Sequence, residues 1–422
     1  MASQRTDEAA QTPHWSMRSL AAVCALVLVA ACTPAPSIAP PSTVPTDYPI
    51  GTPLLSPTAS APASSPSPNP TTRPVSWDQA FEVKRGSLGD LTEWRGGFIA
   101  SGCIHDSSGY CGQAIVVSSP DGRSWDTIEV NGTPTFGFGS LQRAGKRLFA
   151  LGYGDIGFGG GAVVWTSVDG REWSRVRSDT FNARAIGQVI NSPAGTFAFG
   201  YNAPPDNDNT SGFVIWPIHD DGSFGGVQVV DTSKSFRVNT GVVWTGAEFL
   251  AWGGRDGPHP SPSTLLLSSP NGTSWSARGE IRGERRISIN QILAFGDRLI
   301  AVGSQRLFFP LKPRAWISND RGRTWKSAEV EGDNAGISVV GLDGASLIAR
   351  GFQSSTGDDG VAVSWISANG RSWTLLPRDQ DLPAVEGFRG LAPVTIGERT
   401  CVAGTSNAEE LTSAAIYCRE AR

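Results

Sequence analysis

Residues 298–325 read RLIAVGSQRLFFPLKPRAWISNDRGRTW and contain both elements on which the fold prediction depends. The first element is LIAVG, a short apolar strand that ends in Gly303. The same kind of strand occurs elsewhere as FIASG, LFALG, FAFG, FLAWGG, LIARG and CVAG. The glycines of these strands follow one another at steps of 48 to 53 residues: Gly102, Gly152, Gly200, Gly253, Gly303, Gly351 and Gly404.

A repeat of about 50 residues is the length of one blade of a β-propeller. The seven Gly-ended strands therefore predict seven blades, each a four-stranded antiparallel sheet, in residues 76–422. The 422-residue chain has 50 Gly and 14 Trp but only 2 Met, which favours strands and turns over helix bundles. The expected fold class is all-β.

The second element is the segment SNDRGRTW at 318–325, which follows the Gly-ended strand. Related segments are SSPDGRSW (118–125), TSVDGREW (166–173), PIHDDGSF (217–224), SSPNGTSW (268–275) and SANGRSW (367–373). Asp or Asn accepts hydrogen bonds from turn amides and Gly tolerates a positive φ, so each segment predicts a tight hairpin between two strands. Because the acid or amide recurs in every copy, we expect a structural and not a catalytic role for Asp121, Asp169, Asp221, Asn271, Asp320 and Asn369.

These turn segments resemble the Asp-box, or BNR, repeat, whose pattern is S-x-D-x-G-x-T-W. Residues 318–325 match the pattern, whereas the other copies are one residue shorter between the acid and the aromatic residue, and one of them ends in Phe224. The resemblance implies a β-propeller of the sialidase-like superfamily. The chain is also similar to the propellers that assist photosystem II assembly, which are binding proteins without enzymatic activity.

The two ends of the repeat region predict how the ring closes. Six turn segments accompany seven Gly-ended strands, and the chain ends with the strand SAAIYCRE (413–420) without a further turn segment. At the other end, VSWDQAFEV (75–83) is similar to RSWDTIEV (123–130), which follows the first turn. We therefore expect the N-terminal strand to complete the last blade, which removes exposed sheet edges and closes the propeller.

The residues before the propeller predict export. Residues 20–31, LAAVCALVLVAA, are too few to span a bilayer and are typical of the apolar region of a signal peptide, here residues 1–31. The ending VAAC resembles the bacterial lipobox, which implies a lipid-modified Cys32 that anchors the chain outside the cell membrane. An ordinary signal peptide, with Cys32 unmodified, is the alternative. Residues 32–75 are rich in Pro, Ser and Thr and predict a disordered, extended stalk.

Four cysteines remain in the predicted propeller, and their spacing suggests local pairs. A hairpin centred on residues 409 and 410 places Cys401 opposite Cys418, and one centred on Ser107 places Cys103 opposite Cys111. An even number of cysteines in an exported chain favours two disulfides. A metal site that includes Cys103 and Cys111 is not expected, because thiols are oxidised outside the cytoplasm.

The sequence indicates a binding module more strongly than an enzyme. Sialidases use three arginines, the first commonly within R-I-P, together with a Tyr nucleophile; R-I-P is absent here, so no catalytic residue is assigned. An exo-glycosidase of sialidase type is the alternative. Tyr153 and Tyr201 directly follow strand glycines, and Phe308 and Phe309 lie in a long apolar loop; these four are candidates for a ligand-binding face.

Composition limits the partners. The formal net charge of −4 argues against the broad basic surface that nucleic-acid binding needs. We expect a monomer without cofactor or metal, attached to the membrane through Cys32, that binds an envelope protein or a glycan.

Overall fold

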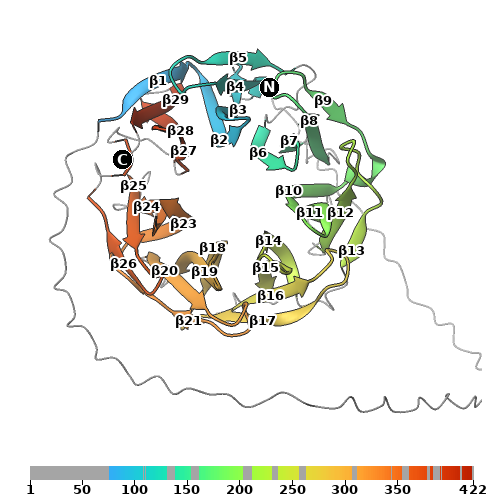
Figure 1. Ribbon diagram of the computed structural model, residues 1–422, viewed down its shortest axis with the longest axis vertical. Helices are drawn as coiled ribbons and strands as arrows, with labels where there is room; N and C mark the ends of the chain where they lie inside the picture. The colour runs from blue at the N-terminus through green and yellow to red at the C-terminus, as the bar shows by residue number, and fades with distance from the viewer. Residues whose placement is uncertain are drawn as a thin grey trace, which may run out of the picture. The chain divides into compact units, whose positions relative to one another are not determined.

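The computed structural model describes residues 76–422 apart from 108, 110, 131–137, 154–160, 203–211, 231–235, 256–262, 307–310, 344, 354–360, 378–380, 384–389, 391, 409–410 and 421–422. Seven antiparallel sheets stand around a central axis (Figure 1). The predicted fold class is confirmed. The signal peptide, Cys32 and the stalk lie outside the described residues.

The blades follow one another along the chain, and their strands are these. Blade 1 has β2 (Gly86–Trp94), β3 (Gly97–His105), β4 (Cys111–Ser119) and β5 (Asp126–Glu129); blade 2 has β6 (Phe138–Ala144), β7 (Arg147–Tyr153), β8 (Ala162–Ser167) and β9 (Ser174–Val176). A 3-10 helix, η2 (Asp179–Phe181), leads to blade 3, with β10 (Arg184–Ser192), β11 (Gly195–Asn202), β12 (Phe213–Ile218) and β13 (Gln228–Val230). Blade 4 has β14 (Phe236–Trp244), β15 (Phe249–Arg255), β16 (Ser263–Ser269) and β17 (Ser276–Arg282); blade 5 has β18 (Ile287–Phe295), β19 (Arg298–Arg306), β20 (Leu311–Ser318) and β21 (Lys326–Ser327). Blade 6 has β23 (Ala335–Asp343), β24 (Ser346–Gln353), β25 (Val361–Ser367) and β26 (Ser372–Leu375); blade 7 has β27 (Val394–Ile396), β28 (Arg399–Ala408), β29 (Leu411–Glu420) and β1 (Asp78–Val83).

Blade 6 departs from the predicted four strands. A fifth strand, β22 (Glu329–Val330), pairs in parallel with β26. The chain that follows the turn segment of blade 5 therefore divides: Lys326–Ser327 pairs within blade 5, and the two residues of β22 join the next blade. Backbone pairing thus links blades 5 and 6 along their outer edge.

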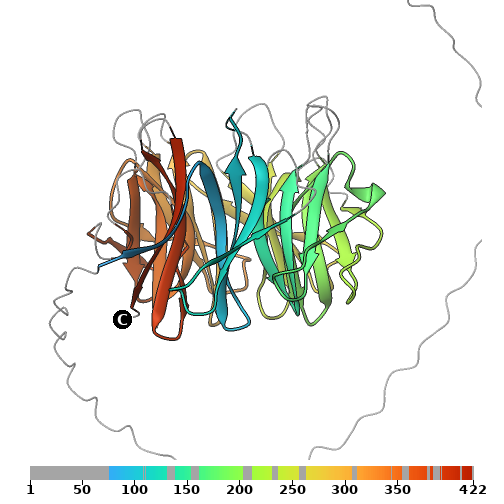
Figure 2. The same cartoon turned by 90° about the horizontal axis from the view of Figure 1, so that it is seen from above.

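Each blade has two different ends, because its strands alternate in direction. The hairpin between the first and second strands and the turn segment between the third and fourth strands lie at one end. We call this end of the ring the hairpin-turn face. The second strand of each blade ends, and its third strand begins, at the opposite end of the ring (Figure 2).

The ring closes as predicted. Strand β1 pairs antiparallel with β29, with Asp78 opposite Cys418 and Val83 opposite Ala414. A disulfide joins Cys401 and Cys418 on β28 and β29 of the same blade, and these cysteines are direct cross-strand partners. The N-terminal strand therefore lies outermost in a blade that is otherwise formed by the C-terminal strands.

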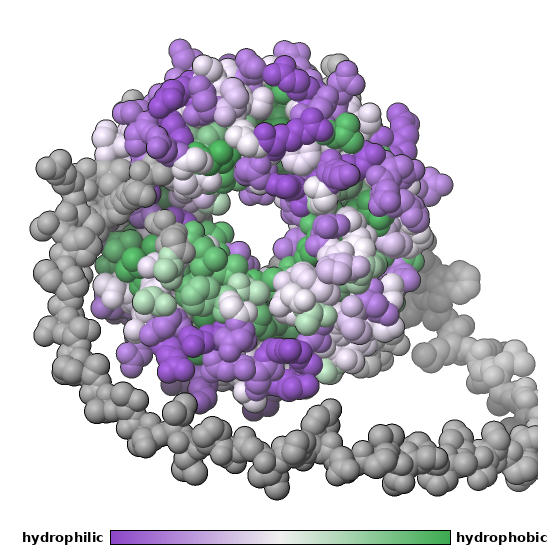
Figure 3. Space-filling view, in the orientation of Figure 1, coloured by the Kyte–Doolittle hydropathy of each residue, from purple (hydrophilic) through white to green (hydrophobic). Residues whose placement is uncertain are grey.

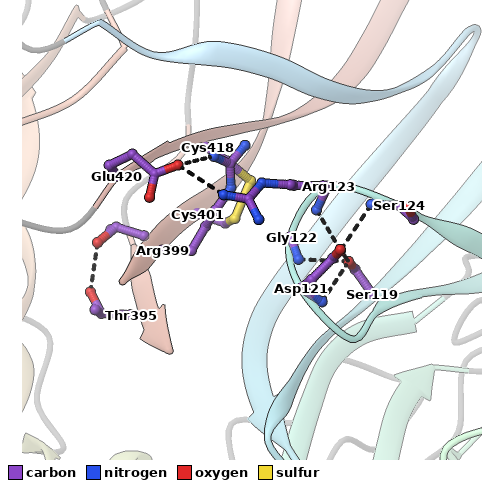
Figure 4. Close-up of a disulfide and its surroundings, with 11 residues drawn as sticks. Ser119, Asp121, Gly122, Arg123, Ser124, Thr395, Arg399, Cys401, Cys418 and Glu420 are labelled. Carbon is purple, nitrogen blue, oxygen red and sulfur yellow. Dashed lines mark hydrogen bonds and ion pairs between the residues drawn. A yellow bond between two sulfur atoms is a disulfide. The ribbon is translucent and has the colours of Figure 1, made fainter. Parts of the chain in front are cut away.

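A polar contact adds to this closure on the hairpin-turn face. Glu420 lies between Arg399 of its own blade, at 2.9 Å, and Arg123 of blade 1, at 3.2 Å (Figure 4). The Arg123 and Glu420 side chains are more than half exposed, so this bridge contributes less than about 1 kcal/mol. The backbone pairing and the disulfide carry most of the closure.

The other disulfide corrects one predicted register. Cys103 and Cys111 are joined, but they are not opposite each other: Cys103 pairs with Ala114, and Cys111 pairs with His105. A bulge between Ile104 and His105 shifts the register, so the sulfur atoms meet diagonally across the hairpin. Both disulfides indicate an oxidising, extracytoplasmic location. In the described part of the chain, no helix is long and apolar enough to cross a membrane.

The hydrophobic core lies between the blades. Each of six clusters of buried residues joins two neighbouring sheets, for example blades 2 and 3 around Trp216 and blades 5 and 6 around Trp365. Both indoles are fully buried, and their N–H groups donate to the Thr180 hydroxyl and the Glu331 carbonyl. Buried apolar side chains therefore hold the sheets together face to face.

A buried ion pair fixes the segment between blades 6 and 7. Arg350 on β24 donates two hydrogen bonds to Asp381, at 2.6 and 3.1 Å, and Ser364 donates a third at 2.8 Å. Burial alone would raise the pKa of Asp381, but the Arg350 charge and hydrogen bonds, with smaller contributions from Ser364 and Arg419, lower it. Because both ions are buried, removing either one would leave an uncompensated charge in the core.

Candidate functional site

The turn segments form the hydrogen bonds that their sequence predicts. The Asp121 carboxylate accepts from the N–H groups of Arg123 and Ser124, at 2.8 and 3.0 Å, and from the Ser119 hydroxyl (Figure 4). Asp169, Asp221, Asn271, Asp320 and Asn369 likewise accept at least one turn amide. In four of these turns the following Trp donates its indole N–H to the turn glycine's carbonyl.

The turn glycines lie at the joints between blades. Their φ angles are positive, from 71° at Gly122 to 85° at Gly222, which favours glycine. A Cβ atom would also meet the preceding blade: at Gly170 it would lie 2.9 Å from Ile99, and at Gly370 it would lie 2.4 Å from Ile300. These contacts support a structural role for the turn segments, as expected from their repetition.

The predicted ligand-face residues are only partly described. Tyr201 is half-buried at the end of β11, where it pairs with Ala185 and Phe213. Tyr153 ends β7, and its side chain lies outside the described residues, as do Phe308 and Phe309. The structure therefore does not bring these four residues together into one described site.

A different site lies on the hairpin-turn face, where blades 1, 2 and 3 meet. A pocket of about 570 Å³ opens there between the first hairpins of the three blades and the turn segments of blades 2 and 3. Its basic lining residues are Arg95, Lys146, Arg147 and His219, and Asp220 supplies one carboxylate. We call it the hairpin pocket.

The basic residues come from short and rigid connections. Arg95 is in the two-residue turn between β2 and β3, and Lys146 is in the corresponding turn between β6 and β7. Arg147 starts β7, and its Nε atom donates to the Asp220 carbonyl at 3.0 Å. Because tight hairpins have few alternative conformations, they hold the backbone of these charged residues near defined positions.

A second, smaller pocket adjoins the first. It measures about 290 Å³, lies between blades 1 and 2, and is lined by Trp94, Arg95, Asp126, Asp169 and Arg171, among others. Arg95 lines both pockets, so they form neighbouring depressions on either side of one hairpin tip. The Arg95 guanidinium carbon lies 5.7 Å from the centre of the Trp94 ring, a cation–π distance.

The hairpin-turn face has two chemically different sectors. Figure 3 shows it with hydrophilic surface over blades 1 to 3 and hydrophobic surface beside the central opening over blades 5 and 6. In the hydrophobic sector, the Leu342 side chain at the end of β23 is 57% exposed. The hairpin pocket belongs to the hydrophilic sector.

Comparison with known proteins supports the fold and nothing finer. No family model and no curated protein sequence matches the chain. A polysaccharide lyase, the ulvan lyase of family PL25, is 11% identical with a TM-score of 0.55; the alignment covers 82% of this chain and 96% of the lyase. The chain is a seven-bladed β-propeller. The Pyrococcus horikoshii acylaminoacyl peptidase is 10% identical with a TM-score of 0.51, over 79% of this chain and 51% of the peptidase. This propeller chain therefore aligns with about half of that enzyme's length.

A third structural relative is a Trypanosoma rangeli sialidase, 11% identical with a TM-score of 0.45, over 79% of this chain and 59% of the sialidase. The matches to the lyase and the peptidase, at 11% and 10% identity, show a common fold and do not transfer activity.

Sequence reasoning missed the hairpin pocket. Its basic residues are 50 or more positions apart between blades 1 and 2, and its third wall comes from blade 3. The local signals were the charged hairpin tips WRGG (94–97) and AGKR (144–147), where other blades have neutral or acidic tips such as SPAG (192–195). Within the described residues, no group of three or more His, Cys, Asp or Glu side chains is placed to hold a metal ion.

Proposed function

We propose that this chain is an exported, lipid-anchored Asp-box propeller that acts as a binding or scaffolding module for a protein or glycan of the cell envelope. One observation carries the proposal: three cationic side chains, on two hairpins of a closed ring, line the hairpin pocket. Concave sites with a few converging polar groups on a rigid scaffold are typical of ligand binding. The two disulfides agree with a location outside the cytoplasm.

A sedimentation experiment tests binding. Every version of the full chain carries Cys32→Ser, so that no acyl chain can insert into a membrane, and is mixed with isolated cell envelopes, which are then pelleted and washed. We expect the chain with an otherwise wild-type sequence to pellet with the envelopes, and the chain that also carries Arg95→Glu and Lys146→Glu to remain in solution. Lys326→Glu, in the outer strand of blade 5, is the matched control and should pellet like the wild type. Equal pelleting of all three chains would contradict the proposal.

A glycosidase assay tests the alternative. The full chain is incubated with fluorogenic glycosides, including a sialoside, and product is measured over hours. We expect no turnover above the buffer rate. Turnover that disappears in Tyr201→Phe or Tyr153→Phe would show that the chain is a sialidase-like exo-glycosidase and not a binding module.

Lipid attachment has a separate test. In cells labelled with a fatty acid, the wild-type chain should carry label and fractionate with membranes, because two or more acyl chains give stable anchoring. Cys32→Ser should abolish labelling and release the chain from the membrane fraction. A labelled Cys32→Ser chain would show that the acyl group is elsewhere.

A further inference from the structure

We propose that the hairpin pocket binds an anionic sugar, with its carboxylate or phosphate group held by Arg95, Lys146 and Arg147. This inference rests on the proposed binding function and names the chemical class of the ligand. It places the binding site on the hairpin-turn face.

The first argument is that nearby carboxylates do not balance the charges of Arg95, Lys146 and Arg147. Within the described residues, none of the three cations forms an ion pair with a carboxylate. Other arginines of the same face do: Arg143 pairs with Glu93, and Arg399 pairs with Glu420. Three cations face two carboxylates, that of Asp220 in the lining of the hairpin pocket and that of Asp221 beside it, whose charged form Arg147 favours, so the pocket keeps an excess of positive charge. Such an excess attracts an oxyanion.

The second argument is the backbone at Arg95. Its φ is +51°, in the left-handed region that glycine favours. Glycine occupies the equivalent turn position in blades 2, 5 and 7, as Gly145, Gly296 and Gly397. An arginine at this position costs conformational energy without improving the turn, and a cost of this kind is more common at functional sites than elsewhere.

The third argument is that Arg147 is already positioned. Its Nε atom is held by the Asp220 carbonyl, and its side chain packs on Gly222, where an added Cβ would lie 3.2 Å from the Arg147 Cδ, Nε and Nη1 atoms. A side chain that is ordered before binding loses less rotamer entropy when the ligand arrives. A planar guanidinium also matches the geometry of a carboxylate or phosphate.

The shape and the remaining walls favour a ring-sized ligand over a free anion. The hairpin pocket, at about 570 Å³, falls in the range of small-molecule sites. Val168, which is 47% exposed, and Ile218 supply an apolar wall, whereas Asn191 and Thr196 supply hydrogen-bonding groups. A sugar ring presents both apolar C–H surface and hydroxyl groups, so it can contact both kinds of wall.

Calorimetric titration of the full chain in detergent tests the inference. The probes are glucuronate for a carboxylate, glucose 6-phosphate for a phosphate, and glucose as the neutral match. We expect one or both anionic sugars to bind about tenfold more tightly than glucose, because the acidic group accepts charge-assisted hydrogen bonds that a neutral hydroxyl group does not. The preferred probe identifies the acidic group. Raising the salt concentration should weaken this binding.

Two variants locate the site. Arg95→Gly introduces the residue that suits the turn, so the melting temperature of the variant should equal or exceed that of the wild type. Its affinity for the anionic sugar should fall about tenfold. Arg321→Gly is the matched control: it removes another arginine with a positive φ, 58°, from the turn segment of blade 5. The control should bind like the wild type.

The outcomes separate the two proposals. The proposal that the ligand is an anionic sugar is wrong if glucose and the anionic sugars bind with equal affinity. It is also wrong if the Arg95→Gly chain binds them as well as the wild type does. If envelope sedimentation still depends on Arg95 and Lys146, the proposed function then stands with another ligand. If sedimentation is also independent of these residues, both proposals fail.

Discussion

At the scale of single residues, the repeated glycine has a steric explanation. A Cβ on Gly303 would lie 1.8 Å from the Ser288 carbonyl oxygen, and a Cβ on Gly200 or Gly351 would lie equally close to the carbonyl of its own inner strand. The first strand of each of these blades has a bulge at this point, between Ile289 and Gln291 in blade 5. The bulge pushes a carbonyl toward the second strand, so only glycine fits opposite it.

Gly303→Ala should therefore destabilise the propeller by about 3 kcal/mol, because backbone atoms must move to admit a methyl group. Thermal unfolding followed by circular dichroism measures the change. Gly341→Ala is the control, since nothing lies within 4 Å of the added Cβ there. A similar melting temperature for the two variants would contradict the steric explanation.

The carboxylate of Asp320 stabilises its turn through several hydrogen bonds. Burial would raise the pKa of Asp320, but the Thr324 hydroxyl and N–H, with Ser318 and Arg323, lower it from 3.8 to about 2. A lowered folded-state pKa means that this stabilisation is present above pH 4 and is lost as the pH falls through about 2.

Asp320→Ala should accordingly cost about 1 kcal/mol at neutral pH, a value that allows for solvent screening. The stability difference between wild type and variant should shrink between pH 4 and pH 2. Denaturant unfolding at several pH values gives both quantities. Asp297→Ala removes an acid whose side chain is 92% exposed and should change little; a difference that persists at pH 2 would exclude the carboxylate as its source.

At the scale of strands, side chains of one inner strand satisfy the backbone of the next. The Gln188 Oε1 atom accepts the Val242 N–H at 2.5 Å, and the Gln291 Oε1 atom accepts the Val340 N–H at 2.6 Å. Gln142 does the same for Val189. Each of these N–H groups follows the bulge of its strand, where the pairing shifts. The polar side chain replaces a ladder hydrogen bond that the bulge removes.

Asp90 occupies the same kind of position between blades 1 and 2. It accepts hydrogen bonds from Ser140 and the Leu141 N–H, yet desolvation by the surrounding protein is larger and raises its pKa. The Asp90 residue itself is exposed to solvent. A carboxylate thus does in blade 1 what an amide does in blades 2, 3 and 5.

Gln291→Leu should leave the Val340 N–H without its acceptor and destabilise the chain by about 1–3 kcal/mol. Hydrogen exchange by mass spectrometry should show faster exchange in the peptide that contains Val340. The peptide that contains Val242 provides the internal reference, because Gln188 remains in place. Unchanged exchange at Val340 would mean that another group satisfies the N–H.

At the scale of the whole molecule, ring closure gives the last strand of the chain a pairing partner. Without β1, the long strand β29 would be an exposed edge with unpaired N–H and C=O groups. Exposed edges pair with other chains. The disulfide between Cys401 and Cys418 stabilises blade 7 but supplies no partner for that edge.

Deletion of residues 76–83 should therefore lower the melting temperature and produce oligomers. Size-exclusion chromatography with light scattering measures the mass, and calorimetry measures the unfolding. Deletion of residues 33–75, the predicted stalk, is the control and should leave both unchanged. A monomeric chain without residues 76–83 that unfolds like the wild type would show that β1 is dispensable for closure.

Sequence alone was sufficient for the architecture, because the architecture depends on local and repeated signals. The Gly-ended strands, the Asp-Gly turns and the likeness of residues 75–83 to 123–130 each report on a neighbourhood of a few residues, and their period counts the blades. Local hairpin spacing also predicted both cysteine pairs, although the bulge at Ile104 changed the register of one.

Only the tertiary structure decided where cationic side chains gather and how neighbouring blades are joined. Arg95, Lys146 and Arg147 meet because two hairpins from different repeats share one face, and the Arg350–Asp381 pair and the Gln291–Val340 bond likewise cross between elements. Hydrophobic periodicity specifies which residues face the core. It does not specify the distance between polar side chains of different blades. The packing angle and the register of the sheets determine that distance.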